Sequence, residues 1–505
     1  MRGAASHWAI RGAARLLARP ELQLTLMFAG SRYLLHRAGV AIHRLPLDGS
    51  WQLIDPELLQ HELLLSVLYL HSQPPLYNLL VGALLQLCPD PAAAARAMDA
   101  LYAGLGLLLV LLVHRLMRHL GAGPGISLAA AALFSLSPAA LLYENYAFYT
   151  HPAAVLLCLC AFLFHRTVSA FTPGRALALF TALAAMVYLR SLFQIAWFLA
   201  LALLCAWALP KRRGTVALAA LVPLLLVTAL YAKNAAITGH FATSTWLGMS
   251  FAKLTTMQLA HPQRQAMVDA GALSPLALQA PFSAPGAYPE YLASTPATGV
   301  AVLDRTRKSS GGINFNHAAY PAISSQYLND AMVVLRRHPG VYLESVGVAH
   351  LMYFRPAADY PFLQHHRERI APWVRGYNYA AAGQPVYVEE PTFELGGPGD
   401  VGYFVVAAFA VCVGFGGAAA WRCLRGQRGP IDAVLTFLWL NVLYVTVVGN
   451  ALEMDENQRF RFLINPLLAV MLAVFITRAG AAWRRNARQR NAGQRPSLQG
   501  VPPPR

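Results

Sequence analysis

The chain has 505 residues, of which 56% are hydrophobic and 12% are charged, and its formal net charge is +17. Soluble globular proteins carry about 25% charged residues, so this composition excludes a soluble enzyme and indicates an α-helical polytopic membrane protein. The basic residues lie in short clusters between apolar segments, which is typical of cytoplasmic loops and argues against a nucleic-acid partner.

Apolar segments near the length of a membrane-spanning helix recur along the chain and predict about ten spans. They cover residues 22–43, 93–113, 125–142, 152–168, 175–190, 191–209, 214–232, 401–421, 431–449 and 462–482. The first follows a basic N-terminus without a convincing cleavage site, so it is interpreted as an uncleaved helix. A shorter run at residues 74–88 begins with two prolines and is predicted to lie in the membrane interface.

The basic clusters favour one orientation. If the N-terminus is cytoplasmic and residues 74–88 do not span, every basic loop falls on the cytoplasmic side, as the positive-inside rule requires. Both termini are then cytoplasmic and nearly all carboxylates lie outside. Because acidic residues contribute little to topology, we expect binding or catalysis on the outer face.

This orientation divides the chain into four parts. Residues 1–232 form an N-terminal transmembrane module that includes the first outer loop at 44–92. Residues 233–400 form a cap of mixed helix and loop on the outer face, packed with interfacial helices over the ends of the spans. Residues 401–483 supply the C-terminal transmembrane helices, and the basic, proline-rich residues 484–505 are predicted to be a disordered cytoplasmic tail.

The first outer loop gathers acidic residues in an otherwise apolar chain. Asp48 and Asp55 are candidate general bases, since an ionised carboxylate takes a proton from an attacking hydroxyl. Glu57 is a candidate substrate ligand. The alternative is that these loop carboxylates are simply solvated.

The same loop ends in an element with two prolines, which fix the entry into the following helix. Its candidate substrate-binding residues are His71, Gln73, Tyr77 and Asn78. The alternative is helix punctuation with an incidental histidine.

The third predicted span ends in aromatic residues around Glu144. Interfacial belts explain the tyrosines, but a carboxylate at membrane depth is costly unless it is paired or functional. Glu144 is therefore a candidate second acid, or a ligand for a metal or an acceptor. Tyr146, His151 and, in the cap, Trp246 are further candidate substrate ligands.

Several cations lie on the predicted outer side, against the topological trend. Arg190, Lys233, Arg459 and Arg461 are candidates for binding the phosphate of a lipid substrate. The alternatives are snorkelling to headgroups, or internal pairing with Glu453, Asp455 and Glu456.

Taken together, these elements resemble the GT-C class of integral-membrane glycosyltransferases, in particular the bacterial branch related to protein O-mannosyltransferases and the aminoarabinose transferase of lipid A. The resemblance rests on the acidic first outer loop, His71–Asn78, the segment from Ser137-Pro138 to Glu144, Arg190, and the run Glu456–Phe462 followed by Pro466. It is strongest in the first half of the chain.

The resemblance implies a bacterial inner-membrane enzyme that transfers a sugar from a polyprenyl-phosphate donor to a glycan, lipid or protein acceptor on the outer face, usually with inversion. It also implies that a first-loop carboxylate is the base, with Asp55 preferred to Asp48. The chain lacks the adjacent Asp-Glu pair of these families and a lysine before the double proline. Phosphate binding therefore falls to the arginines and lysine named above. No cofactor follows with certainty, and a divalent metal ion is the candidate.

Two other functions compete with sugar transfer. A transporter or flippase would carry ionisable residues deep within its spans, whereas polar residues here gather at the outer ends. A non-catalytic GT-C-like scaffold or binding subunit is the stronger alternative, and the missing Asp-Glu pair is its best support.

Overall fold

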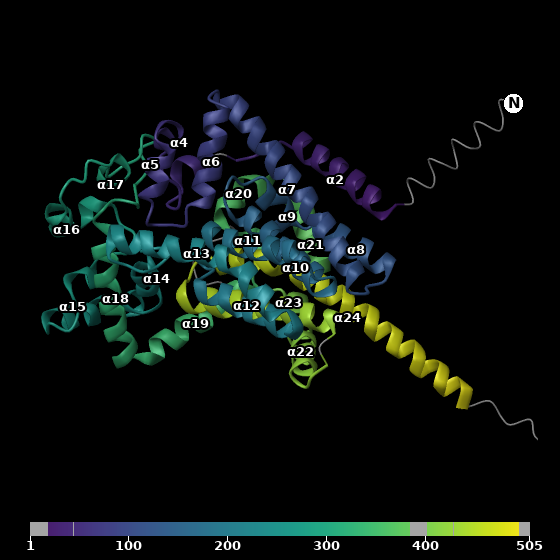
Figure 1. Ribbon diagram of the computed structural model, residues 1–505. Coiled ribbons are helices and arrows are strands. Elements are labelled where there is room, and N and C mark those ends of the chain that lie inside the picture. The colour runs from purple at the N-terminus through teal and green to yellow at the C-terminus, as the bar shows by residue number, and fades with distance from the viewer. Residues whose placement is uncertain (1–18, 44, 384–400, 428, 494–505) are drawn as a thin grey trace, which may run out of the picture.

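The computed structural model describes residues 19–43, 45–383, 401–427 and 429–493. These residues form helices and loops without a strand (Figure 1). The basic N-terminal residues 1–18, the end of the predicted cap at 384–400 and the end of the predicted tail at 494–505 lie outside the described residues.

The long helices form one bundle, and the ten predicted spans all fall on helices. Their bounds are α2 Pro20–Arg37, α7 Pro91–His119, α8 Pro124–Ser135, α9 Pro138–Glu144, α10 Thr150–Ser169, α11 Pro173–Leu189, α12 Ile195–Ala208, α13 Arg213–Thr238, α22 Tyr403–Leu424, α23 Pro430–Leu452 and α24 Asn457–Gly493. Many begin with proline, whose missing N–H costs nothing in a first turn. Asp90, Ser137 and Thr172 cap three of them by accepting backbone N–H groups.

The protein is a polytopic helical membrane protein, but fewer helices than expected have full spanning length. Among the described residues six helices are long and apolar enough to cross a membrane, or seven if α8 and α9, bent by 54°, count as one span. The helices α11 and α12 have 17 and 14 residues, short of the roughly 20 that a bilayer requires. Six or seven of the described helices therefore meet this length criterion, against about ten predicted spans, because an apolar window does not show where a helix ends.

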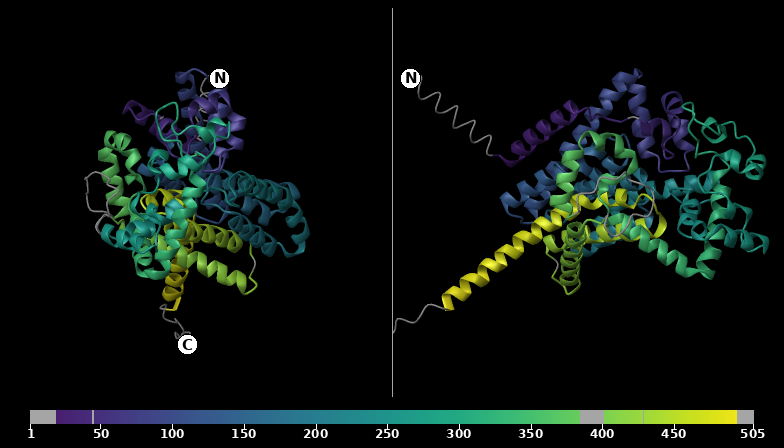
Figure 2. Two further views of the ribbon diagram at one scale, coloured as in Figure 1. Left: turned by 90° about the vertical axis from the view of Figure 1, so that its left-hand side faces the viewer. Right: turned by 180° about the vertical axis from the view of Figure 1, so that it is seen from behind.

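The helix α10 lies at the centre of the bundle and packs against α7, α11, α23 and α24. Most of its side chains are buried. The helix α6, Leu76–Leu87, has only 12 residues and is too short to span, as residues 74–88 were predicted to be. The helix α24 extends far from the body and continues through Gly493 (Figures 1 and 2). The beginning of the predicted disordered tail is therefore helical.

The cap is an assembly of short helices at one end of the molecule (Figure 1). It contains α14 Leu247–Leu254, α15 His261–Asp269, α16 Pro289–Ser294, α17 Ala301–Asp304, α18 Tyr320–Arg337 and α19 Pro339–Phe354. An aromatic core that includes Trp246, Tyr320 and Tyr327 holds this assembly together. At Gly248 the helices α14 and α18 approach so closely that a Cβ would lie 1.8 Å from the Ser324 carbonyl oxygen, so the packing requires glycine there.

Candidate functional site

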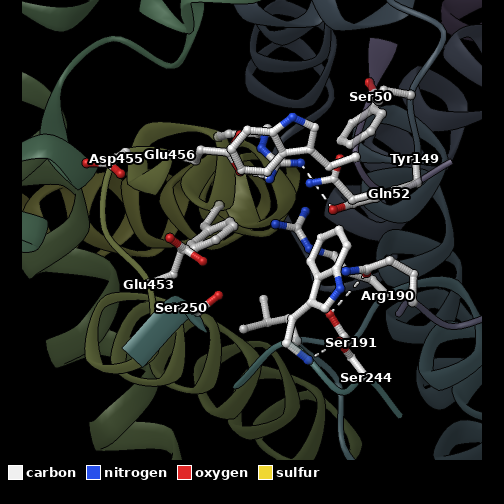
Figure 3. A pocket seen from close by; sticks show the side chains of 18 of the residues that line it. Ser50, Gln52, Tyr149, Arg190, Ser191, Ser244, Ser250, Glu453, Asp455 and Glu456 are labelled. Carbon is white, nitrogen blue, oxygen red and sulfur yellow. Dashed lines mark hydrogen bonds and ion pairs between the residues drawn. The ribbon is translucent and has the colours of Figure 1, made fainter. Parts of the chain in front are cut away.

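A cavity of about 850 Å³ lies where the bundle meets the cap. Its walls come from the first outer loop, the turn after α11, the start of the cap, and the connection between α23 and α24. Figure 3 shows Glu453, Asp455 and Glu456 on one side of this cavity and Arg190 and Ser191 on the other. Three carboxylates thus lie across the cavity from Arg190.

Arg190 is the C-cap residue of α11 and only 2% of its surface is exposed. Its guanidinium carbon lies 4.7 Å from the ring centre of Phe460 and 5.2 Å from that of Tyr149. One of its terminal nitrogens, Nη1, has no hydrogen-bond partner among the described residues. Burying a charged donor without a hydrogen-bond partner is costly, and the ring faces of Phe460 and Tyr149 compensate part of that cost.

Arg459, in the first turn of α24, is equally buried and lines the same cavity. It forms an ion pair with Glu456 and lies 3.4 Å from the Tyr149 and Thr150 hydroxyl oxygens. Burial alone would raise the pKa of Glu456, but Arg459 and the Tyr360 hydroxyl, 2.7 Å from the carboxylate, outweigh it and hold the pKa below its usual value. Glu456 is therefore ionised at neutral pH and fixes the guanidinium.

The connection between α23 and α24 carries two further carboxylates. Lys253 Nζ, from the cap, lies 2.5 Å from Glu453 Oε1 and 2.8 Å from Asp455 Oδ2. Burial alone would lower the pKa of Lys253, but these two carboxylates outweigh it and hold the pKa above its usual value. Asp455 has φ of 97°, a conformation that is costly outside glycine and recurs at functional sites. The cap is thus tied by charge to a strained loop in the cavity wall.

Aromatic and small polar side chains complete the lining on the cap side. Trp51 is 44% exposed and stacks on Phe282, with ring centres 5.1 Å apart. Trp246 meets Phe282 edge to face at 5.3 Å. Gln73 Oε1 accepts a hydrogen bond of 3.3 Å from the Ser191 hydroxyl. Such a mixture of apolar faces and isolated hydrogen-bonding groups is typical of small-molecule sites.

The structure brings some predicted site residues to the cavity and leaves others away from it. The predicted residues in the lining are Gln73, Tyr146, Arg190, Trp246 and Arg459. The others, discussed below, are outside it.

Asp55 lies outside the lining and is 4% exposed. It caps α4, Pro56–His61, and accepts hydrogen bonds from Ser309 N at 2.8 Å and Ser309 Oγ at 2.5 Å. Arg305 pairs with both Asp55 and Glu57. Because donors from the cap occupy both of its oxygens, Asp55 clamps the first outer loop to the cap and has no oxygen left to bind a substrate.

Asp48 lies on α3, Leu45–Gly49, and is exposed. It is itself absent from the lining, although Pro46, Gly49 and Ser50 of the same segment contribute to it. Lys308 Nζ donates to the Ser50 carbonyl oxygen at 2.7 Å. Burial lowers the pKa of this lysine to about 8. Asp48 is thus adjacent in sequence to residues of the lining, but its own side chain is outside the lining.

The histidine and asparagine of the double-proline element brace the loops instead of facing the cavity. His71 Nδ1 lies 2.9 Å from Thr245 Oγ1 and its Nε2 lies 3.0 Å from the Asn316 carbonyl oxygen. Asn78 Oδ1 accepts the Ile54 N–H at 2.8 Å. Burial lowers the pKa of His71 to about 3, so the ring is neutral and joins the first outer loop to the cap.

Three predicted residues lie in a polar cluster inside the bundle. Glu144 forms a two-point ion pair with Arg32, at 2.6 and 2.9 Å. The Tyr77 and Tyr102 hydroxyls lie 2.6 Å apart, and the His151 ring stacks on Tyr102 with centres 5.8 Å apart. Glu144 is therefore paired, which removes the reason for assigning it to catalysis.

The two remaining predicted cations, Lys233 and Arg461, do not line the cavity. Lys233 donates to the Leu70 carbonyl oxygen, and Arg461 is 3% exposed without lining the cavity. The described part of the chain contains no group of three or more His, Cys, Asp or Glu side chains arranged to hold a metal ion.

Sequence reasoning named Glu453, Asp455 and Glu456 only as pairing partners for the arginines that follow them. Their position just before a helix rich in arginine was the available signal. Lys253 and Trp51 were missed, and no local pattern distinguishes them. Their roles arise from contacts across the fold.

Comparison with known proteins adds little. No protein-family model and no curated protein matches the sequence. Among solved structures the chain is similar to ArnT from Cupriavidus metallidurans in the apo state, at 14% identity and a TM-score of 0.32, over 89% of this chain and 77% of that chain.

Proposed function

We propose that this protein is a membrane glycosyltransferase that moves a sugar from a polyprenyl-phosphate donor to an acceptor in the cavity between bundle and cap. The observation that carries the proposal is the buried guanidinium of Arg190, with an unpartnered nitrogen, in the same lining as Arg459. Guanidinium groups suit phosphate, whose oxygens accept the paired N–H donors. Two of them in a lining whose surface is mostly apolar favour an anionic group attached to a lipid.

The proposed reaction needs a leaving group, an acceptor and a base. The acceptor oxygen attacks the anomeric carbon, and the bond from that carbon to the phosphate oxygen breaks. The phosphate leaves with the electron pair, and Arg190 and Arg459 stabilise the charge that develops on it. The acceptor proton passes to a carboxylate.

Two carboxylates are candidates for that base. Asp455 lies in the cavity wall, is 32% exposed and contacts Lys253. Asp48 is exposed on the first outer loop and precedes the lining residues Gly49 and Ser50. Asp55 and Glu144 are the weaker choices because their oxygens are already bound to Ser309 and Arg32. On the orientation inferred from charge, the cavity lies on the outer face of the membrane.

The test is donor binding and sugar transfer by the purified chain in lipid nanodiscs, with a panel of polyprenyl-phosphate sugars. We expect Arg190→Gln to lower transfer about a hundredfold, the usual effect of removing one stabilising donor, without loss of folded protein. Arg336→Gln is the matched control, because Arg336 is an exposed arginine of the cap. Transfer by Arg190→Gln at the wild-type rate would overturn the role of Arg190. Donor binding without turnover in the wild type would instead support a binding subunit.

A further inference from the structure

The main cavity, the one between bundle and cap, contains an aromatic cluster that the proposed transfer step does not use. Phe282 and Trp246 of the cap and Trp51 of the first outer loop all line this cavity. Trp51 stacks on Phe282 with ring centres 5.1 Å apart and an angle of 21° between the ring planes. Trp246 meets Phe282 edge to face at 5.3 Å. Phe282 therefore contacts both tryptophans and orients the exposed one.

The backbone at Phe282 is held in a costly conformation. Its φ is 61°, a left-handed value that is a genuine outlier for a bulky side chain. The Tyr288 hydroxyl donates to the Ala280 carbonyl oxygen at 3.0 Å and accepts the Ser283 N–H at 3.2 Å. The Tyr320 hydroxyl donates to the Ser283 carbonyl oxygen at 2.8 Å, and both tyrosines are buried. Strain that the surroundings fix in this way recurs at ligand sites, and here it places the phenyl ring against the exposed indole.

Trp51 presents an open aromatic surface to the cavity. Phe282 packs against one side of the indole, yet 44% of Trp51 remains exposed. Ser50 and Gln52, its neighbours in sequence, also line the cavity. A pyranose ring combines an apolar face of C–H bonds with hydroxyls around its edge. An aromatic face beside isolated hydrogen-bonding groups is complementary to that combination.

The aromatic cluster and the two arginines belong to different parts of the same lining. Arg190 and Arg459 come from the bundle and are each 2% exposed, and the proposed function assigns them the donor phosphate. The cluster comes from the first outer loop and the cap. A volume of about 850 Å³ lies in the upper half of the range for small-molecule sites, so the cavity has room for a second ring beside the donor head group.

We propose that Trp51 and Phe282 form a stacking platform for a pyranose ring of the acceptor, which is therefore a carbohydrate. This proposal rests on the proposed function and names the acceptor class of the same site. The indole fixes the plane of the acceptor ring, and the lining beside it offers hydrogen-bonding groups to the ring hydroxyls. The hydroxyl of a serine or threonine in a peptide needs no such platform.

The first test measures binding of methyl β-glucopyranoside to the full chain in nanodiscs by saturation-transfer NMR. In the wild type, we expect the strongest transfer to the axial hydrogens that share one face of the ring. Sorbitol, a polyol without a ring, should give no transfer. Trp51→Ala should remove the signal, and Trp51→Phe should retain part of it, at unchanged thermal stability. Trp483→Ala is the matched control, because Trp483 is 73% exposed and lies outside the cavity lining.

The second test measures sugar transfer with an oligosaccharide acceptor and with a peptide acceptor. Trp51→Ala should raise the KM for the oligosaccharide about tenfold and leave the KM for the donor unchanged. A rise in the donor KM alone would overturn the assignment to the acceptor, as would transfer to the peptide at a rate that does not depend on Trp51.

Equal glycoside signals from wild type and Trp51→Ala, or equal signals from glycoside and sorbitol, would overturn the platform. If Trp51→Ala does not fold, the fluorine resonance of Trp51, assigned with Trp51→Phe, is followed in protein labelled with 5-fluorotryptophan. A change in that resonance on titration with the glycoside supports the platform, and a constant resonance overturns it.

The two proposals fail differently. If Arg190→Gln stops transfer and Trp51→Ala leaves the acceptor KM unchanged, only the platform is lost. If the wild type transfers no sugar but binds the glycoside through Trp51, the transferase fails and the sugar site stands.

Discussion

Two segments rich in carboxylates, one in the first outer loop and one between α23 and α24, have different surroundings. Asp55 in the first cluster is 4% exposed and is bound by the backbone and hydroxyl of Ser309. Asp455 in the second is 32% exposed and lies in the wall of the main cavity, against Lys253. The first cluster fastens the loop to the cap, and the second faces open volume.

The difference shows that a local density of carboxylates does not identify a reactive site. The deciding feature is the type of partner. Backbone N–H groups and the short hydroxyl side chains of serine have little freedom to move, so they hold a carboxylate at a fixed position. A lysine at a cavity wall can exchange its carboxylate for a charged ligand, because its side chain is long and partly exposed.

The largest effect is expected at the clamp. Asp55→Ala leaves Ser309 and the Glu57 N–H without their acceptor and removes one of the two partners of Arg305, so it should lower the free energy of unfolding by about 3 kcal/mol. Thermal unfolding in detergent measures this. The control is Glu57→Ala, which removes only a half-exposed contact with Arg305 and should cost less than about 1 kcal/mol. If the protein with Asp55→Ala is as stable as wild type, the first cluster is not a clamp.

The opposite pattern is expected at the cavity. Asparagine tolerates the positive φ of this position, and Asp455→Asn removes only a partly exposed ion pair. The free energy of unfolding should therefore change by less than about 1 kcal/mol. If Asp455 is the base, transfer should fall about a hundredfold while donor binding persists. Asp48→Asn, assayed beside it, assigns the base to one of the two. A variant that binds and transfers normally would remove Asp455 from the mechanism.

A smaller effect concerns pH and the His71 brace. The folded-state pKa of about 3 lies below the ordinary value of 6.5, so below pH 6.5 the unfolded chain takes up a proton that the folded chain does not. Stability should therefore fall as the pH falls, by about 2 kcal/mol between pH 8 and pH 5 from this residue alone. Measuring the free energy of unfolding of the wild type and of His71→Gln at pH 8 and at pH 5 isolates the contribution of His71, because the two proteins share all other histidines. Equal pH dependence in the two proteins would contradict the buried, neutral ring.

Much of the architecture follows from local sequence. The apolar runs located the long helices of the bundle, since helical hydrogen bonds connect residues four apart and need no distant partner. They did not locate the 18-residue helix α18 of the cap. The lengths of α11 and α12 and the helical start of the tail did not follow, because packing and end contacts decide where a helix stops. Arg190 and Arg459 were identifiable as cations at the ends of apolar helices, where an unpaired charge is conspicuous.

The sequence by itself determined the class of protein, the positions of its helices and the residues that needed a partner. Only the tertiary structure decided which residues pair with these charged side chains. Ser309 reaches Asp55 across 254 positions, and Lys253 reaches Glu453 across 200. Asp48, Asp55 and Asp455 have the same side chain, and their neighbours in sequence do not reveal that one is sealed under the cap while another faces the cavity. A carboxylate's reactivity depends on its local donors and its access to ligand, and both arise where distant segments meet.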